Sequence, residues 1–190
     1  MTERTILILG DSPFLAKVHE KVRPLLDRYY SIGINNIITK YYTNEHIFVD
    51  KPFTALTNNY VGKTVSPKAY DALIHKENKY LVDMFSFSFE KHTEKDICIG
   101  NRVAWCGFTH DYAISYCIQQ GFKRIILVGA ADFTSGPHFS TPYTFKYSKY
   151  CKEKSRKFIE DYVSKVVTIE TCNPDSYLCI PRVSINDLLK

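Results

Sequence analysis

The sequence predicts an α/β protein, a Rossmann-like three-layer sandwich with a mainly parallel sheet. Two short apolar runs, residues 5–9 and 125–128, each end at a glycine, which is typical of buried parallel strands. Stretches with helical spacing lie between the predicted strands, and such alternation favours a parallel sheet with helices on both faces. The chain has 190 residues, so we expect one domain over residues 1–190.

The predicted strands are short apolar or β-branched runs that end at turn residues. They are expected at residues 5–9, 31–34, 47–49, 97–99, 125–128 and 166–170. Asn35 and Asn36 follow the second run, and Asp50 follows the third; all are common turn residues. The strand ends therefore carry polar side chains.

The predicted helices have apolar residues at helical spacing or a capping signal. They are expected at residues 14–30, 69–74, 80–85, 109–120, 148–163 and 184–189. Pro24 should kink or split the first helix. Gly121 is well placed to end the helix before it, and Ser184 with Asp187 has capping-box spacing. The remaining pattern between residues 53 and 95 is irregular.

Composition and charge exclude several classes of protein. No run approaches the roughly 18 apolar residues of a membrane span, and no secretory signal is visible, so we expect a soluble, cytoplasmic protein. The 6 cysteines include no CxxC pair, so neither a disulfide framework nor a structural zinc site is expected. The net charge of +5 can assist binding to the phosphates of a nucleotide or a nucleic acid, and it demands neither.

The carboxyl ends of the predicted strands are the place to look for a site, because ligands bind there in parallel α/β sheets. Gly10 lets the backbone approach a ligand closely, and the amides that open the next helix can receive a phosphate. The GxGxxG fingerprint is absent. A tight strand-to-helix turn explains Gly10 equally well.

Residues 10–12, Gly-Asp-Ser, resemble the start of the SGNH (GDSL) hydrolases, which would make Ser12 a nucleophile. Those enzymes also need a Gly-x-Asn-Asp element and a late Asp-x-x-His that carries the base. Residues 33–36 match the first element only in part and lie too early in the chain. The last histidine of the chain is His138, so the late Asp-x-x-His is absent. Because a serine without a base is a poor nucleophile, the hydrolase is the minor alternative.

A second resemblance covers most of the chain. The stretches ILGDSPFL, GINNI, IFVDKPF, QGFKRIILVGAADF and CNPDSYL follow one another in order. They resemble the bacterial lipo-oligosaccharide sialyltransferases and related small Rossmann-like glycosyltransferases. In that family the first strand ends in a Gly-Asn-Gly-Pro-Ser-Leu type loop, the second in an Asn and the third in an Asn-Pro. The resemblance implies transfer of a sugar from a nucleotide-activated donor to an acceptor hydroxyl, with no cofactor besides that donor and no metal required.

The resemblance also implies roles for individual residues. The donor would be bound by Gly10, Asp11, Ser12, Asn35, Asp50, Thr109, Gly129, Tyr143 and Tyr147. Asp132 matches the family's acidic residue near the cytidine and is a candidate catalytic residue. The family has Asn where this chain has Asp11, and a carboxylate would repel a phosphate. Asp11 would therefore hold a ribose hydroxyl or a bridging metal.

A base must deprotonate the acceptor hydroxyl. The family's late histidine has no match, so His138 is the first candidate and His110 the second, since neutral histidine suits this role near pH 7. The acceptor is a glycan or a modified base in DNA, and the oligomeric state is open. The competing interpretation is a non-catalytic nucleotide- or sugar-binding module that kept the fold and lost the base.

Overall fold

The computed structural model describes residues 4–50, 59–75, 77–132, 139–140 and 148–190. Its centre is a seven-stranded sheet in the order β10-β9-β1-β2-β3-β4-β5, and every neighbouring pair is parallel. Its strands are Thr5–Leu9 (β1), Tyr30–Ile34 (β2), Glu45–Ile47 (β3), Lys63–Ser66 (β4), Lys79–Leu81 (β5), Arg124–Val128 (β9) and Thr168–Thr171 (β10). The predicted α/β fold with a parallel sheet is confirmed.

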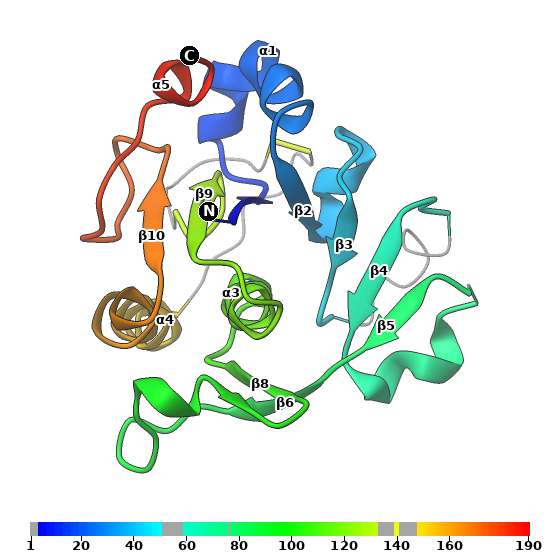
Figure 1. Ribbon diagram of the computed structural model, residues 1–190, viewed down its shortest axis with the longest axis vertical. Coiled ribbons are helices and arrows are strands. Elements are labelled where there is room, and N and C mark those ends of the chain that lie inside the picture. Colours follow the sequence, from blue (N-terminus) through cyan, green and yellow to red (C-terminus); the bar gives the residue numbers. More distant parts are fainter. Residues whose placement is uncertain (1–3, 51–58, 76, 133–138, 141–147) are drawn as a thin grey trace.

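Helices cover both faces of this sheet and complete a three-layer arrangement (Figure 1). The helices α1 (Phe14–Leu26) and α5 (Ile185–Leu188) lie on one face, and α3 (Thr109–Gln119) and α4 (Lys149–Asp161) lie on the other. The 3-10 helices are Asn35–Thr39 (η1), Lys68–Leu73 (η3), Glu94–Asp96 (η4) and Val163–Lys165 (η5). None of the helices in the described residues has the length and hydrophobicity that a membrane span requires.

A second, smaller sheet packs against α3 on the side away from the main sheet (Figure 1). Its strands, in the order β6-β8-β7, are Asp83–Ser86 (β6), Arg102–Trp105 (β8) and Cys98–Ile99 (β7). The pairing of β6 with β8 is parallel, and the pairing of β7 with β8 is antiparallel. The helix α3 is therefore enclosed between two sheets, and nine of its residues are buried.

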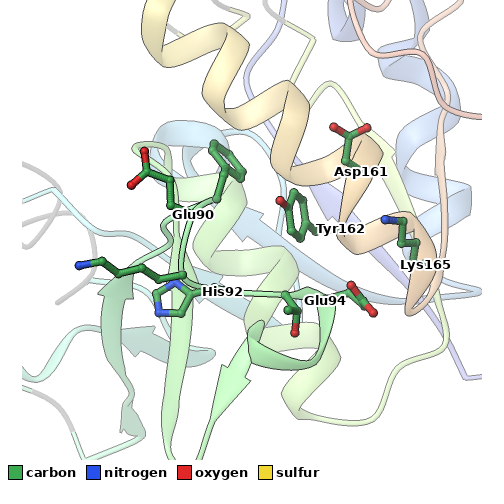
Figure 2. A pocket seen from close by; sticks show the side chains of 9 residues that line it. Glu90, His92, Glu94, Asp161, Tyr162 and Lys165 are labelled. Atoms are coloured by element: carbon green, nitrogen blue, oxygen red, sulfur yellow. The ribbon is translucent and has the colours of Figure 1, made fainter.

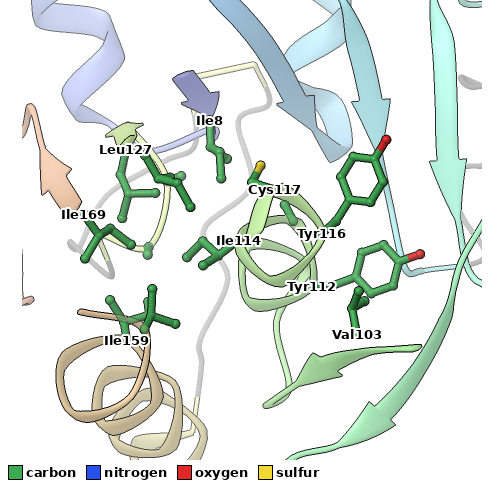
Figure 3. Packing of buried hydrophobic residues seen from close by; sticks show 14 of the residues in the cluster. Ile8, Val103, Tyr112, Ile114, Tyr116, Cys117, Leu127, Ile159 and Ile169 are labelled. Carbon is green, nitrogen blue, oxygen red and sulfur yellow. The ribbon is translucent and has the colours of Figure 1, made fainter. Parts of the chain in front are cut away.

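The side chains of the central strand alternate between two apolar clusters. Ile6 and Ile8 of β1 face α3 and α4, whereas Leu7 and Leu9 face α1 and α5, and all are fully buried. Figure 3 shows Ile8 on the cluster of α3 and α4. A strand that is buried on both faces must be apolar throughout, which explains the uninterrupted run in the sequence.

The structure differs from the sequence prediction between residues 79 and 105. The helix expected at residues 80–85 is wrong, because β5 and β6 occupy this stretch and belong to different sheets. Buried Val82 joins them. The strand β8 was not expected, and it pairs with both β6 and β7. Pairing with distant strands decides the conformation here, since β preference depends strongly on context.

The ends of the helices mostly follow the sequence signals. Gly121 ends α3 with a φ of +79°, and Phe122 N donates to the carbonyl of Cys117 at 3.1 Å, as in a Schellman motif. The Ser184 side chain accepts from the Asp187 amide at 3.1 Å and caps α5. Pro24 lies inside α1, which continues to Leu26 as one helix, shorter than the expected 14–30.

A buried polar network holds the amino edge of the sheet, where β2, β3 and β4 begin. Glu45 is 5% exposed, and its Oε1 accepts from Tyr30 at 2.7 Å and from Lys63 at 3.0 Å. Its Oε2 accepts from the Tyr116 hydroxyl of α3 at 2.9 Å. Burial and the nearby Glu45 carboxylate raise the pKa of both tyrosines, so they remain donors at neutral pH. The carboxylate thus joins three strands and a helix.

Glu45→Gln is expected to lower the free energy of unfolding by about 2–3 kcal/mol, because an amide nitrogen would then meet donors that need an acceptor. Urea unfolding followed by circular dichroism measures the effect. The matched control is Glu20→Gln on the exposed surface of α1, which should change stability by less than about 0.5 kcal/mol. Equal effects of the two substitutions would contradict this role of Glu45.

Candidate functional site

The candidate site lies where β1 and β9 end, at the point where the order of strands in the sheet reverses. Strands β2 to β5 extend the sheet on one side of β1, and β9 and β10 extend it on the other. In open α/β sheets, ligands bind in the crevice outside the carboxyl ends of the strands at such a switch point. The residues that follow β1, β2, β9 and β10 therefore make up the candidate site.

Two glycines allow the loops after β1 and β9 to touch. Gly10 N donates to the Val128 carbonyl, and Ser12 N donates to the Gly129 carbonyl, each at 3.1 Å. A Cβ on Gly10 would lie 2.3 Å from the Gly129 oxygen. Gly129 has a φ of +69°, and a Cβ there would lie 2.8 Å from Cγ of Leu15. The close approach of the two loops requires both glycines.

Asp132 is a buried carboxylate in this cluster. It is 2% exposed, and the Ser12 hydroxyl donates to its Oδ2 at 2.7 Å. Burial raises the pKa of Asp132 to about 6, although hydrogen bonding by the side chains of Ser12, Asn173, Ser176 and Thr171 lowers it in part. The side chains of Asn173, Ser176 and Thr171 also lie near this carboxylate, and its Oδ1 makes no hydrogen bond of standard geometry with the described residues. A carboxylate with an open acceptor oxygen and a pKa near neutrality can bind a ligand hydroxyl or accept a proton.

The segment after β10 closes the cluster from the other side; its stretch CNPDSYL was part of the resemblance, but none of its residues was among the predicted site residues. Tyr177 N donates to the Asp132 carbonyl at 3.4 Å. Asn173 is 2% exposed, its Oδ1 accepts from the Asp175 amide at 3.0 Å, and its side-chain amide lies close enough to the Asp132 carboxylate to lower the pKa of that group. The sequence could have indicated Asn173 in the same way as Asn35, because Asn173 also follows a strand that the sequence predicts.

Asp11 lies beside Ser12 and binds a different segment. Its Oδ1 accepts from the Ser140 amide at 2.6 Å, and its Oδ2 accepts from the Ser140 hydroxyl at 2.5 Å. Phe139 N donates to the Asp11 carbonyl at 3.1 Å. Ser140 and Phe139 were not among the expected site residues. A role of Asp11 toward a ribose or a metal stays a prediction.

The two other predicted strand-end residues follow β2 and β3. Asn35 has a φ of +53°, a left-handed conformation that asparagine tolerates better than most residues. Its carbonyl lies 3.1 Å from Nε2 of buried His46, and its Oδ1 is buried with no hydrogen-bond partner among the described residues. Since Gly33 of β2 pairs with Leu9 of β1, Asn35 lies at the same edge as the glycine loops. Asp50 is exposed.

The start of α3 forms a separate buried cluster. His110 is 6% exposed, and its Nε2 lies 2.9 Å from the hydroxyl of Ser155 in α4. That hydroxyl donates to Oδ1 of Asp111 at 2.5 Å. Burial lowers the pKa of His110 to about 3 and raises that of Asp111 to about 7. His110 thus contributes to a contact between α3 and α4 rather than to a hydrogen bond with Asp132, and its neighbour Thr109 is buried.

Three predicted site residues, His138, Tyr143 and Tyr147, lie outside the described residues, so their roles stay predictions. In the ranges that the structure does describe, no group of three or more His, Cys, Asp and Glu side chains is placed to hold a metal ion. All 6 cysteines lie in these ranges and are free thiols.

A surface pocket lies away from the switch point, between residues 89–94 and the end of α4 (Figure 2). The chain runs from this end of α4 through η5 into β10, which places the pocket near the amino edge of the sheet. Its lining has charges of both signs, with Glu90 and Asp161 opposed by Lys165. It does not favour one class of ionic ligand, and none of the predicted site residues lines it.

The fold and the switch point define a Rossmann-like α/β protein. The sequence matches no protein-family model and no curated protein. The structure is similar to that of the MAf glycosyltransferase from Magnetospirillum magneticum AMB-1, with a TM-score of 0.65 and 11% sequence identity. The match covers 97% of this chain and 34% of that chain, so this chain spans about a third of that enzyme. At this identity the likeness shows the fold, and it does not extend to the sialyltransferase family.

Proposed function

We propose that the protein is a glycosyltransferase that moves a sugar from a nucleotide-activated donor to an acceptor hydroxyl. The observation that carries this proposal is the contact of the two glycine loops at the switch point, with the Ser12–Asp132 pair beside it. Ligands of α/β proteins bind at such points. The fold shared with a solved glycosyltransferase supports the same reaction class.

In this proposal the donor nucleotide lies across Gly10, Asn35 and Gly129. The Oδ1 of Asp132 accepts a hydrogen bond from a donor hydroxyl, and the Phe14 amide at the start of α1 faces the phosphate. The acceptor oxygen attacks the anomeric carbon, and the bond to the nucleotide phosphate breaks with its electron pair leaving on the nucleotide. His138 takes the proton of the acceptor hydroxyl.

Calorimetric titration with a panel of nucleotide-sugars and free nucleotides tests the proposal, and at least one of them is expected to bind. Asn35→Gly should weaken that binding about tenfold, since one hydrogen bond contributes about 1 kcal/mol or more. Glycine keeps the left-handed backbone at this position without strain. The control is Asn101→Gly, in the exposed turn between β7 and β8. If no nucleotide or nucleotide-sugar binds to the wild-type protein, the proposal fails.

A non-catalytic binding module is the second candidate, and the position of His110 favours it. This candidate base is buried, hydrogen bonded to Ser155 and low in pKa, so it does not serve as a base at the switch point. His138→Ala separates the two functions. An enzyme should lose turnover while keeping donor affinity, whereas a module has no turnover to lose.

The serine hydrolase is the third and weakest candidate. Ser12 is 8% exposed and its hydroxyl donates to Asp132. Within the described ranges no histidine is hydrogen bonded to it. A fluorophosphonate probe that labels Ser12 would revive this candidate.

The acceptor is a glycan hydroxyl or a modified base in DNA. The two differ in their dependence on salt, because binding to DNA phosphates weakens steeply as the salt concentration rises. A gel-shift titration with duplex DNA at increasing salt therefore distinguishes them.

A further inference from the structure

The carboxylate of Asp11 accepts two hydrogen bonds from the segment Phe139–Ser140. The amide and the hydroxyl of Ser140 donate to the two different carboxylate oxygens, at 2.6 Å and 2.5 Å. The Phe139 amide adds a third bond, at 3.1 Å, to the Asp11 carbonyl. Hydrogen bonds to an ionised carboxylate are among the stronger ones in proteins.

The same segment is fixed on its other side by aromatic contacts. The ring of Phe139 stacks on Tyr41, which follows η1, with 6.0 Å between ring centroids and 13° between planes. It also lies 6.5 Å from the ring of His19 on α1. Residues 139–140 come after β9 in the chain, yet they contact the loop after β1, the helix α1 and the end of η1. They therefore lie against elements on the β1 side of the switch point.

We propose that Asp11 is a positioning residue, whose carboxylate fixes Phe139–Ser140 beside the switch point and does not itself contact the donor. Both carboxylate oxygens already accept hydrogen bonds from one residue, and a phosphate placed against them would be repelled. The importance of this position for donor binding rests on the proposed function.

Asp11→Asn removes the negative charge while the side chain keeps its hydrogen-bonding shape. Its carbonyl oxygen can accept from the Ser140 amide, and its amide nitrogen can donate to the Ser140 hydroxyl oxygen, so both contacts survive without the charge. Alanine loses both contacts. The matched pair for the test is therefore Asp11→Asn and Asp11→Ala.

The first experiment needs no ligand and measures hydrogen exchange of the Ser140 amide by NMR. Exchange should be about 10-fold faster or more in Asp11→Ala and within about 3-fold of the wild type in Asp11→Asn. Unchanged exchange in Asp11→Ala would overturn the proposal, as would equal acceleration in both variants. This measurement remains decisive if the protein binds no nucleotide at all, which would refute the proposed function alone.

The second experiment titrates uridine diphosphate and cytidine monophosphate into the wild type, Asp11→Ala, Ser140→Ala and the double variant. If Asp11 acts through Ser140, the double variant should bind as weakly as Asp11→Ala and no more weakly, because the effects of coupled residues do not add. Additive losses would show that Asp11 contacts the nucleotide directly and would overturn the proposal. Asp11→Asn should retain the affinity of the wild type within about 3-fold.

Discussion

Asp132→Asn is expected to make the protein more stable at pH 8 while removing its affinity for the donor. Burial raises the pKa of Asp132 to about 6, whereas an aspartate in an unfolded chain titrates near about 3.9. Asn keeps the shape and can still accept from the Ser12 hydroxyl, yet it has no charge to bury. It also replaces one acceptor oxygen of the cluster by a donor, which a ligand hydroxyl cannot use in the same way.

The direction of the pH dependence follows from linkage. Between about pH 4 and pH 6 the folded protein keeps a proton on Asp132 that the unfolded chain has released. This group therefore favours the folded state most below about pH 4, and the advantage is lost as the pH rises through about 6. The stabilisation by Asp132→Asn should be about 3 kcal/mol at pH 8 and about half of that at pH 5.

Urea unfolding of both proteins at pH 5 and pH 8 measures this difference. Any cost of the amide that does not depend on pH cancels when the two values are subtracted. Asp27→Asn, which alters an exposed carboxylate at the end of α1, is the control and should show little pH-dependent change. A stability gain that is larger at pH 5 than at pH 8 would contradict the buried, pKa-shifted carboxylate.

Gly10→Ala is expected to lower the free energy of unfolding by about 3 kcal/mol and to abolish donor binding. The added Cβ would lie 2.3 Å from the Gly129 oxygen and 2.6 Å from Cα of Ala130. These are backbone atoms, which cannot rotate away as the end of a side chain can. The ends of β1 and β9 would have to separate, and the bond from Gly10 N to the Val128 carbonyl would lengthen.

Gly100→Ala is the matched control for this substitution. Gly100 has a φ of +58°, and a Cβ there would meet nothing within 4 Å. Gly100→Ala should therefore lower the free energy of unfolding only by the cost of placing alanine in a left-handed conformation, about 1 kcal/mol. Chemical unfolding and nucleotide titration of both variants measure the contrast. A Gly10→Ala protein as stable as the Gly100→Ala protein would show that the loops after β1 and β9 do not touch in solution.

The parts of the fold that were predictable are those with a strong local signal. The uninterrupted apolar runs that became β1 and β9 indicate strands buried on both faces, and a glycine after each run marks the edge where the site lies. The helix α3 was predictable because Gly121 stops it at a defined place. Asn35 was expected at this edge of the sheet by the same reasoning, because it is a polar residue directly after a strand.

The contacts that define the site's interior were not predictable, because they join residues far apart in the chain. Ser12 bonds to Asp132, and Asp11 bonds to Ser140, across more than a hundred residues of sequence. No local sequence pattern indicates a hydrogen bond between residues so far apart in the chain. His110 was expected as a candidate base at the donor site, whereas its ring lies beside the hydroxyl of Ser155 in another helix.

The central position of β1 has a consequence for how the chain folds during synthesis. One edge of β1 can pair with β2 early, because the two strands are close in sequence, but its other edge pairs with Arg124–Val128 of β9. Until the ribosome has released β9, that edge of β1 has exposed backbone donors and acceptors and can pair with another chain. Truncated products that end before β9 should therefore aggregate, and completion of the sheet should be a late and slow event.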